Sequence, residues 1–257
     1  AANDDFDHAG ISIEELQERL QELGSERPPF ESFVTSEWLI GWYSRFALGK
    51  FVDQTSAACS FDSPEFSAAL QMCKDWGQSG GTETLGQRCV LEFENIQDII
   101  RIGTIGELYH DNYCYVGFPT SSGNGSMFEL LSCFAISAQG DKQEAAWEFI
   151  RFALGNLQPD GLLGVGIPAS QSALDERLQF LIETGQTFLE FTHKIKPSDA
   201  DAFRALIENT SMVENSEQGI LKIITDESVS FFTGSKTASE AAALIQNRVQ
   251  LYLMENR

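Results

Sequence analysis

Apolar residues recur along much of this chain at the spacing of amphipathic helices. Residues 11–23 show it clearly, and Ser12 and Glu15 suit a capping box at the start of that helix. The apolar positions of this stripe are Ile13, Leu16, Leu20 and Leu23. Similar patterns predict further helices over residues 36–48, 64–76, 141–154, 171–185, 198–209 and 217–232, and from Glu240 to the C-terminus. Residues 95–109 are expected to form a short helix plus a connector.

Three shorter apolar runs are typical of strands: residues 88–93, 113–118 and 129–137. The third run is expected to form a mostly buried strand. Strands that alternate with helices indicate an α/β or mixed α+β class, here rich in helix.

Particular side chains are expected to face the core or to end a helix. In the helix over 141–154, the expected inward residues are Ala145, Phe149, Ile150 and Phe152, and Trp147 is expected to pack as well. Gly49 and Gly155 are expected to stop their helices, because glycine favours helix C-termini.

The composition limits the possible functions. The 257 residues, 42% of them hydrophobic, suffice for one large domain or two modest lobes. The sequence contains no run of eighteen apolar residues, so no segment is expected to cross a bilayer. The net charge of −21 would repel phosphates, which argues against nucleic-acid binding. No signal segment opens the sequence, so we expect a mature or excised product, with residues 1–8 disordered or adjacent to a tag.

Motifs for metal binding and catalysis are missing from the sequence. The cysteines are widely spaced without a zinc-type pattern, and most are expected to be small buried hydrophobes. They are Cys59, Cys73, Cys89, Cys114 and Cys133. The three histidines are far apart, and no hydrolase, P-loop or dinucleotide motif occurs. We therefore expect no metal, no cofactor and no enzymatic activity.

The C-terminal stretch carries the most specific pattern. Residues 231–257 read FFTGSKTASEAAALIQNRVQLYLMENR, which resembles the ending of carbohydrate-type extracellular solute-binding proteins of ABC importers. Four further segments resemble the same family in the expected order: residues 11–23, 50–76, 115–154 and 166–176. The resemblance implies a type II periplasmic-binding-protein-like lobe, similar to the second lobe of maltose-binding-like proteins, with a mixed sheet flanked by helices.

Members of that family are longer, and the resemblance begins midway along them. It therefore implies a C-terminal fragment in which the first half of lobe one is absent. Residues 9–130 and 167–257 are expected to form lobe two, and residues 131–166 a remnant of lobe one. Without its partner strands, this remnant must pack unusually or expose apolar surface.

The resemblance also implies where a ligand would bind. Aromatic rings stack on sugar faces while carboxylates and amides bind the hydroxyls, so Trp38 and Trp42 are candidate platforms. The alternative is that both tryptophans are core residues, since they share one helix face. The candidate polar residues are Glu94, Asn95 and Gln97 after the strand over 88–93, and Asn215 and Gln218 before a helix. Helix capping and loop formation are the alternatives for these.

We thus expect a non-catalytic substrate-binding component of an ABC transporter that captures a sugar or oligosaccharide between two lobes and delivers it to a membrane permease. Such a protein would be periplasmic, or extracellular and held on the membrane as a lipoprotein. Two alternatives stay open: a single-lobe interaction or structural module, and a secreted glycoside hydrolase.

Overall fold

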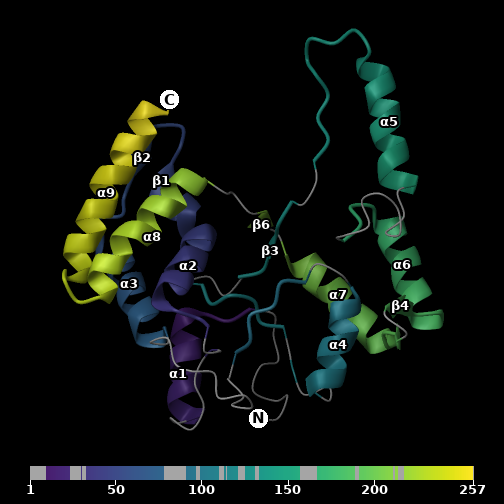
Figure 1. Cartoon of the computed structure of the whole chain (residues 1–257), viewed down its shortest axis with the longest axis horizontal. Helices are drawn as coiled ribbons and strands as arrows, with labels where there is room; N and C mark the ends of the chain where they lie inside the picture. The colour runs from purple at the N-terminus through teal and green to yellow at the C-terminus, as the bar shows by residue number, and fades with distance from the viewer. Residues whose placement is uncertain are drawn as a thin grey trace. The chain divides into compact units, whose positions relative to one another are not determined.

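The computed structural model describes residues 10–23, 30, 33–77, 91–96, 99–109, 113, 115–120, 125–130, 133–156, 167–188, 191–210, 212–213 and 217–256 (Figure 1). Contacts divide the chain into two compact units. Unit 1 comprises residues 1–9, 94–115 and 128–211, and unit 2 comprises residues 10–93, 116–127 and 212–257. Each unit is therefore assembled from three separate stretches of the chain.

Unit 2 is built mainly of helices. They are α1 (Ile13–Leu23), α2 (Ser36–Phe51), α3 (Pro64–Trp76), α8 (Gln218–Phe232) and α9 (Ala238–Glu255). Helix α2 packs against α3 and α8, and α8 packs along α9 (Figure 1). Fully buried side chains from these helices form the core, among them Leu39, Ile40, Phe66, Leu70, Ile224 and Ile245. The predicted helices are thus confirmed in this unit.

The helix caps in unit 2 follow the sequence closely. The backbone N–H of Glu15 donates to Ser12 Oγ at 3.0 Å, and Ser63 caps α3, which has Pro64 in its first turn. Helix α9 opens with a complete capping box between Thr237 and Glu240. The backbone and side-chain hydrogen bonds from Thr237 hold the pKa of the Glu240 carboxyl below its usual value.

A hairpin of β1 (Val52–Asp53) and β2 (Ala58–Cys59) joins α2 to α3, and two glutamines of α9 bind its backbone. The side chain of Gln246 accepts from the N–H of Phe61 at 2.6 Å and donates to the carbonyl of Cys59 at 2.9 Å. One turn later, Gln250 accepts from the N–H of Cys59 at 3.3 Å and donates to the carbonyl of Ala57 at 2.8 Å. We call this arrangement the glutamine clamp.

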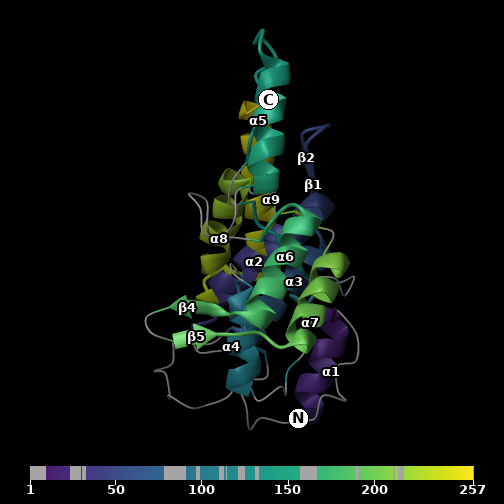
Figure 2. The ribbon, with the colours of Figure 1, turned by 90° about the vertical axis from the view of Figure 1, so that its right-hand side faces the viewer.

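Unit 1 holds α4 (Ile100–Tyr109), α5 (Gln143–Asn156), α6 (Gln171–Glu183) and α7 (Pro197–Asn209). Strands β4 (Gln186–Phe188) and β5 (Phe191–His193) form an antiparallel hairpin, and α4 contacts both α7 and β5 (Figure 2). The core of this unit includes Ile99, Ile102, Leu178, Leu181, Ile195 and Phe203. Strands β3 (Met127–Phe128) and β6 (Met212–Val213) form a two-stranded sheet.

Among the described residues, two of the three predicted strands form only isolated β-bridges. Within 88–93, Leu91 forms a single parallel bridge with Phe30, and within 113–118 Gly117 forms one with Gly125. The described residues of 129–137 form no strand and are exposed, which corrects the prediction of a buried strand. The reason is that a buried strand needs neighbouring strands on both sides, and the described chain supplies none here.

Helix α5 also differs from its prediction. Ile150 is buried, whereas Ala145, Phe149 and Phe152 are exposed, and so is Trp147. Residues 131–166 thus expose apolar side chains on α5, while their assignment to lobe one stays a prediction. The glycines did not act as stops either. Helix α2 continues through Gly49 until β1 begins, and α5 continues through Gly155.

The cysteines follow the expectation only in part. Of those that the structure describes, Cys73 is buried, Cys59 is half-buried and Cys133 is exposed, and all three are free thiols. Burial raises the pKa of the Cys73 thiol well above its usual value. Cys89 and Cys114 lie outside the described residues.

The residue ranges of the two compact units do not coincide with the ranges predicted for the two lobes. Residues 131–166 fall in unit 1 together with residues 94–115 and 167–211, rather than standing apart from them. Which lobe of a solute-binding fold each segment corresponds to stays a prediction.

Candidate functional site

Two of the predicted ligand residues lie together on α2. Trp38 and Trp42 are one helical turn apart, and their ring centroids are 5.6 Å apart with the planes tilted by 45°. The hydroxyl of Thr35 caps the helix by accepting from the N–H of Trp38 at 3.2 Å, which fixes the backbone at the start of this face. Both tryptophans are half-buried.

Phe93 packs against both tryptophan rings. Its centroid lies 4.6 Å from that of Trp38 in an edge-on arrangement, and 4.5 Å from that of Trp42 at a tilt of 49°. Such centroid distances are typical of favourable aromatic pairs, each worth about 0.5–1.5 kcal/mol beyond area burial. The loop residue Phe93 therefore helps to hold the orientation of both indoles.

Further aromatic side chains extend this group, one beside Trp38 and two beyond Trp42. Phe33 meets Trp38 edge-on at 6.1 Å, Phe46 lies 6.5 Å from Trp42, and Phe118 stacks on Phe46 at 5.1 Å. The guanidinium of Arg45 lies 4.8 Å from the centre of the Trp42 ring, within cation–π range. We call the six rings the aromatic cluster: Phe33, Trp38, Trp42, Phe46, Phe93 and Phe118.

The cluster bears on both interpretations of the tryptophans. Their mutual packing agrees with a structural role, while their partial exposure leaves indole surface that a ligand could meet. Phe46 was missed as a candidate, although Trp38, Trp42 and Phe46 recur every four residues and so share one helix face. Phe93 and Phe118 are distant in sequence, and no local pattern places them here.

Glu94 and Asn95 follow Phe93 in the chain and belong to unit 1. The carboxylate of Glu94 forms a two-point ion pair with Arg101, whose Nε donates to Oε2 at 3.0 Å while Nη2 donates to Oε1. Arg101 lies in the first turn of α4, so Glu94 is tied to the helix that follows it. The side chain of Asn95 is exposed, and Gln97 lies outside the described residues.

A tyrosine pair lies in the same unit. Tyr113 and Tyr115 meet edge-on with centroids 5.4 Å apart, and Tyr115 is half-buried. Burial, followed by interactions with Tyr113, Asp199 and Glu94, raises the pKa of the Tyr115 phenol well above its usual value. This hydroxyl stays protonated at neutral pH and can act as a hydrogen-bond donor.

The remaining predicted residues lie near the start of α8. Gln218 is its first residue and is exposed, and Asn215 lies outside the described residues. Helix α8 packs against α2, the helix that carries the two tryptophans. The structure therefore places Trp38, Trp42 and Gln218 in one unit and Glu94 and Asn95 in the other.

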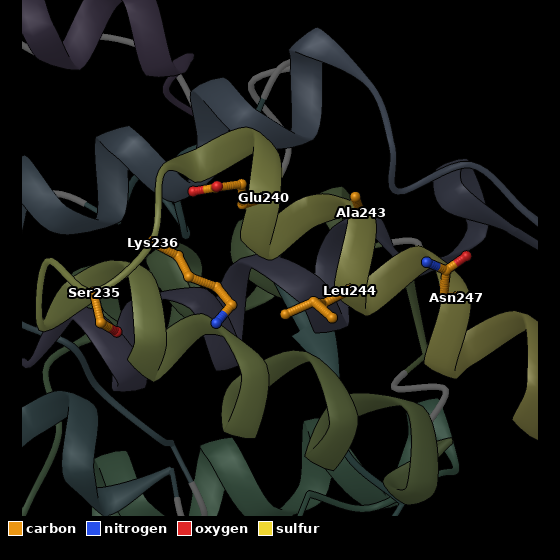
Figure 3. A pocket seen from close by; sticks show the side chains of 6 residues that line it. All are labelled: Ser235, Lys236, Glu240, Ala243, Leu244 and Asn247. Atoms are coloured by element: carbon orange, nitrogen blue, oxygen red, sulfur yellow. The ribbon is translucent and has the colours of Figure 1, made fainter.

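A surface recess lies where α8 turns into α9 (Figure 3). It has a volume of about 410 Å³ and is lined by Ser235, Lys236, Glu240, Ala243, Leu244 and Asn247. The carboxylate of Glu240 is already engaged in the helix cap with Thr237. None of the predicted ligand residues that the structure describes lines this recess. Within the described part of the chain, no group of three His, Cys, Asp or Glu side chains could hold a metal ion.

No family model and no curated protein matches this chain. Solved structures do match it. One is the sugar-binding protein MalE from the phytopathogen Xanthomonas citri, with 12% identity, a TM-score of 0.57, and coverage of 98% of this chain and 66% of that chain. The chain has the fold of the type II periplasmic binding proteins.

A second match agrees with the first. An ABC transporter solute-binding protein from Thermotoga lettingae TMO, bound with α-D-tagatose, has 13% identity and a TM-score of 0.52, with coverage of 96% of this chain and 66% of that chain. The fold class and the family resemblance predicted from the motifs are therefore confirmed as a likeness of fold. The chain spans just under two thirds of the length of both proteins, which are binding proteins rather than enzymes. Among the described helices, none is both long and apolar enough to cross a membrane.

Proposed function

We propose that this chain is part of the substrate-binding component of an ABC importer and that its ligand is a sugar or oligosaccharide. The observation that carries the proposal is the fold match, which extends over 98% of the chain to a sugar-binding protein. Aromatic rings gathered on one helix face agree with such a ligand, because sugar rings offer C–H groups to π faces.

In this proposal Trp38 and Trp42 supply the stacking surface. Phe93 and Phe46 support them from the side, and Arg45 lies over Trp42. Because the indoles already pack on one another, little side-chain freedom is lost when a ligand binds. The aromatic cluster would then act as a preformed platform rather than as a flexible loop.

Polar groups would bind the sugar hydroxyls. Asn95 and Gln218 are exposed and can both donate and accept hydrogen bonds. Glu94 would present a carboxylate whose position is set by Arg101. Gln97 and Asn215 complete the proposed set from outside the described residues.

Capture would follow from closure of two lobes around the ligand, and the closed form would dock on a membrane permease. A ligand can drive closure only through a higher affinity for the closed state. In this scheme residues 9–130 and 167–257 correspond to lobe two, and residues 131–166 to part of lobe one. The protein would be periplasmic, or extracellular and anchored as a lipoprotein.

Titration calorimetry with a panel of mono- and oligosaccharides tests the proposal on the full product of the gene. We expect Trp38→Ala and Trp42→Ala to weaken binding about tenfold or more, equivalent to about 1.4 kcal/mol. Phe180→Ala is the matched control, because it removes an exposed ring on α6 that is outside the proposed site. The chain by itself should bind weakly. Micromolar binding by this chain alone would contradict a site divided between two lobes.

One observation favours a second candidate, a single-lobe interaction module. Helix α5 exposes large apolar side chains, as a protein-binding surface often does. Size-exclusion chromatography with light scattering distinguishes the two candidate functions. A tight dimer that buries residues 131–166 would support the interaction module.

A further inference from the structure

The first turn of α8 lies against the end of α9. The two helices run antiparallel, because a short turn over residues 233–237 joins them and they pack along each other (Figure 1). Gly219 is the second residue of α8, and Tyr252 lies in the last turn of α9. A Cβ atom at Gly219 would lie 2.5 Å from both Cζ and Oη of Tyr252. The tyrosine ring therefore rests directly on the backbone of α8, at a point where only glycine leaves room for it.

The residue before this helix is held from another side. Glu217 is the N-cap of α8, and its Oε1 accepts from Nε2 of Gln54 at 3.0 Å. Gln54 lies in the turn of the hairpin of β1 and β2. The carbonyl of Glu217 also accepts from the N–H groups of Ile220 and Leu221 at 2.9 and 3.0 Å. The start of α8 is thus fixed by α9, by the hairpin and by its own first turn.

These contacts form a closed loop of connections within unit 2. The glutamine clamp joins α9 to the hairpin. Gln54 then joins the hairpin to α8, and Tyr252 joins α8 back to α9. We call the six residues of this loop the α8 frame: Gln54, Glu217, Gly219, Gln246, Gln250 and Tyr252. Support from two other elements leaves the first turn of α8 little freedom to shift.

The exposed residue at this point is Gln218, which the proposed function assigns to the sugar. Both of its chain neighbours, Glu217 and Gly219, belong to the α8 frame. An amide whose backbone is fixed before binding loses less freedom when it meets a sugar hydroxyl. We propose that Tyr252 is a positioning residue of the sugar site, which holds the first turn of α8 through Gly219 and so places the amide of Gln218. This inference rests on the proposed function and adds to it a residue that does not itself contact the sugar.

Hydrogen exchange tests the structural half of the inference in the full product of the gene, with no sugar present. The amides of Ile220 and Leu221 report the first turn, because both donate to the carbonyl that precedes the helix. Tyr252→Ala should speed their exchange several-fold, whereas Tyr252→Phe keeps the ring and should not. Gly219→Ala should also speed it, since the new Cβ displaces the ring. Leu251→Ala is the matched control, because it truncates the neighbouring side chain, which is 52% exposed.

Titration calorimetry with the sugar panel, maltose and D-tagatose included, tests the functional half. Tyr252→Ala should raise the Kd about tenfold, and Tyr252→Phe should restore it. In a double-mutant cycle, Tyr252→Ala should add less than about twofold once Gln218 is replaced by alanine, because the ring acts only through that amide. Leu251→Ala should leave the Kd unchanged.

The outcomes separate this inference from the proposed function. Unchanged exchange of the first turn in Tyr252→Ala would overturn the inference. Faster exchange with an unchanged Kd would also overturn it, because the ring would then only stabilise the helix pair. The same holds if Tyr252→Ala raised the Kd equally with and without Gln218. A gene product that binds none of the sugars would refute the proposed function, while faster exchange in Tyr252→Ala would still support the α8 frame.

Discussion

Replacing Gln246 by alanine should loosen helix α9 from the hairpin of β1 and β2. The substitution removes an acceptor for the N–H of Phe61 at 2.6 Å and a donor to the carbonyl of Cys59 at 2.9 Å. Each such hydrogen bond contributes about 1 kcal/mol, and a partly buried group left without its partner adds to the loss. Alanine regains a few tenths of a kcal/mol in helix propensity. The expected net loss in the free energy of unfolding is about 2 kcal/mol.

Urea unfolding followed by circular dichroism measures this loss, and a melting curve should shift down by roughly 4–8 °C. Asn247→Ala on the same helix is the control, because Asn247 is exposed. Gln246→Glu gives a sharper test. Its carboxylate can still accept from Phe61, but when ionised it faces the Cys59 carbonyl without a proton to donate. This variant should be destabilised at pH 7 and recover as the pH falls below about 4.3.

The second glutamine of the clamp should be coupled to the first. Gln250 binds the same turn through the N–H of Cys59 and the carbonyl of Ala57. In a double-mutant cycle we expect an interaction energy of at least about 0.5 kcal/mol between the two alanine substitutions. If Gln246→Ala were as stable as Asn247→Ala, Gln246 would not stabilise the fold, and a strictly additive cycle would show that the two glutamines act independently.

Three further predictions concern other parts of the molecule. Gly125→Ala should destabilise by about 1–3 kcal/mol in urea, because its Cβ would overlap the backbone carbonyl of Phe118; wild-type stability would contradict this. The pKa of Glu240 is lowered in the folded state, so its contribution is present above about pH 4.3 and is lost as the pH falls further. The melting temperature of Glu240→Gln should therefore lie below that of the unchanged protein at pH 6–7, and the gap should narrow as the pH falls below about 4.3; a gap that does not narrow would refute this role of the Glu240 carboxylate. With iodoacetamide at pH 8, peptide mass spectrometry should find exposed Cys133 modified well before buried Cys73, whose raised pKa keeps the thiol protonated; the reverse order would contradict the burial described here.

The helices could be predicted because their signals are local. The Ser12 and Thr237 caps, Pro64 in a first turn and apolar stripes at a spacing of three or four all act within a few residues. Gly49 was wrongly expected to end α2. No left-handed turn is formed there, and the helix ends only where Val52 pairs with Cys59 in the hairpin.

The strands and the site could be predicted less well because they depend on distant partners. Residues 129–137 have the composition of a buried strand, but burial requires neighbours that local pattern cannot supply. Trp38 and Trp42 could be paired from their spacing, whereas Phe93 joins them from fifty residues away. Phe149 and Phe152 were expected in the core because they are large and apolar, yet they are exposed. Their spacing identifies an apolar helix face, but it does not identify the element that would pack against that face.

The chain passes between its two units five times, after residues 9, 93, 115, 127 and 211. No truncation at one point can therefore isolate either unit. Helix α2 (Ser36–Phe51) packs against α8 (Gln218–Phe232), which is synthesised much later. The apolar side chains of α2 that contact α8 stay uncovered while the intervening residues are made, so a chaperone that shields α2 during translation would be expected to raise the yield of folded protein.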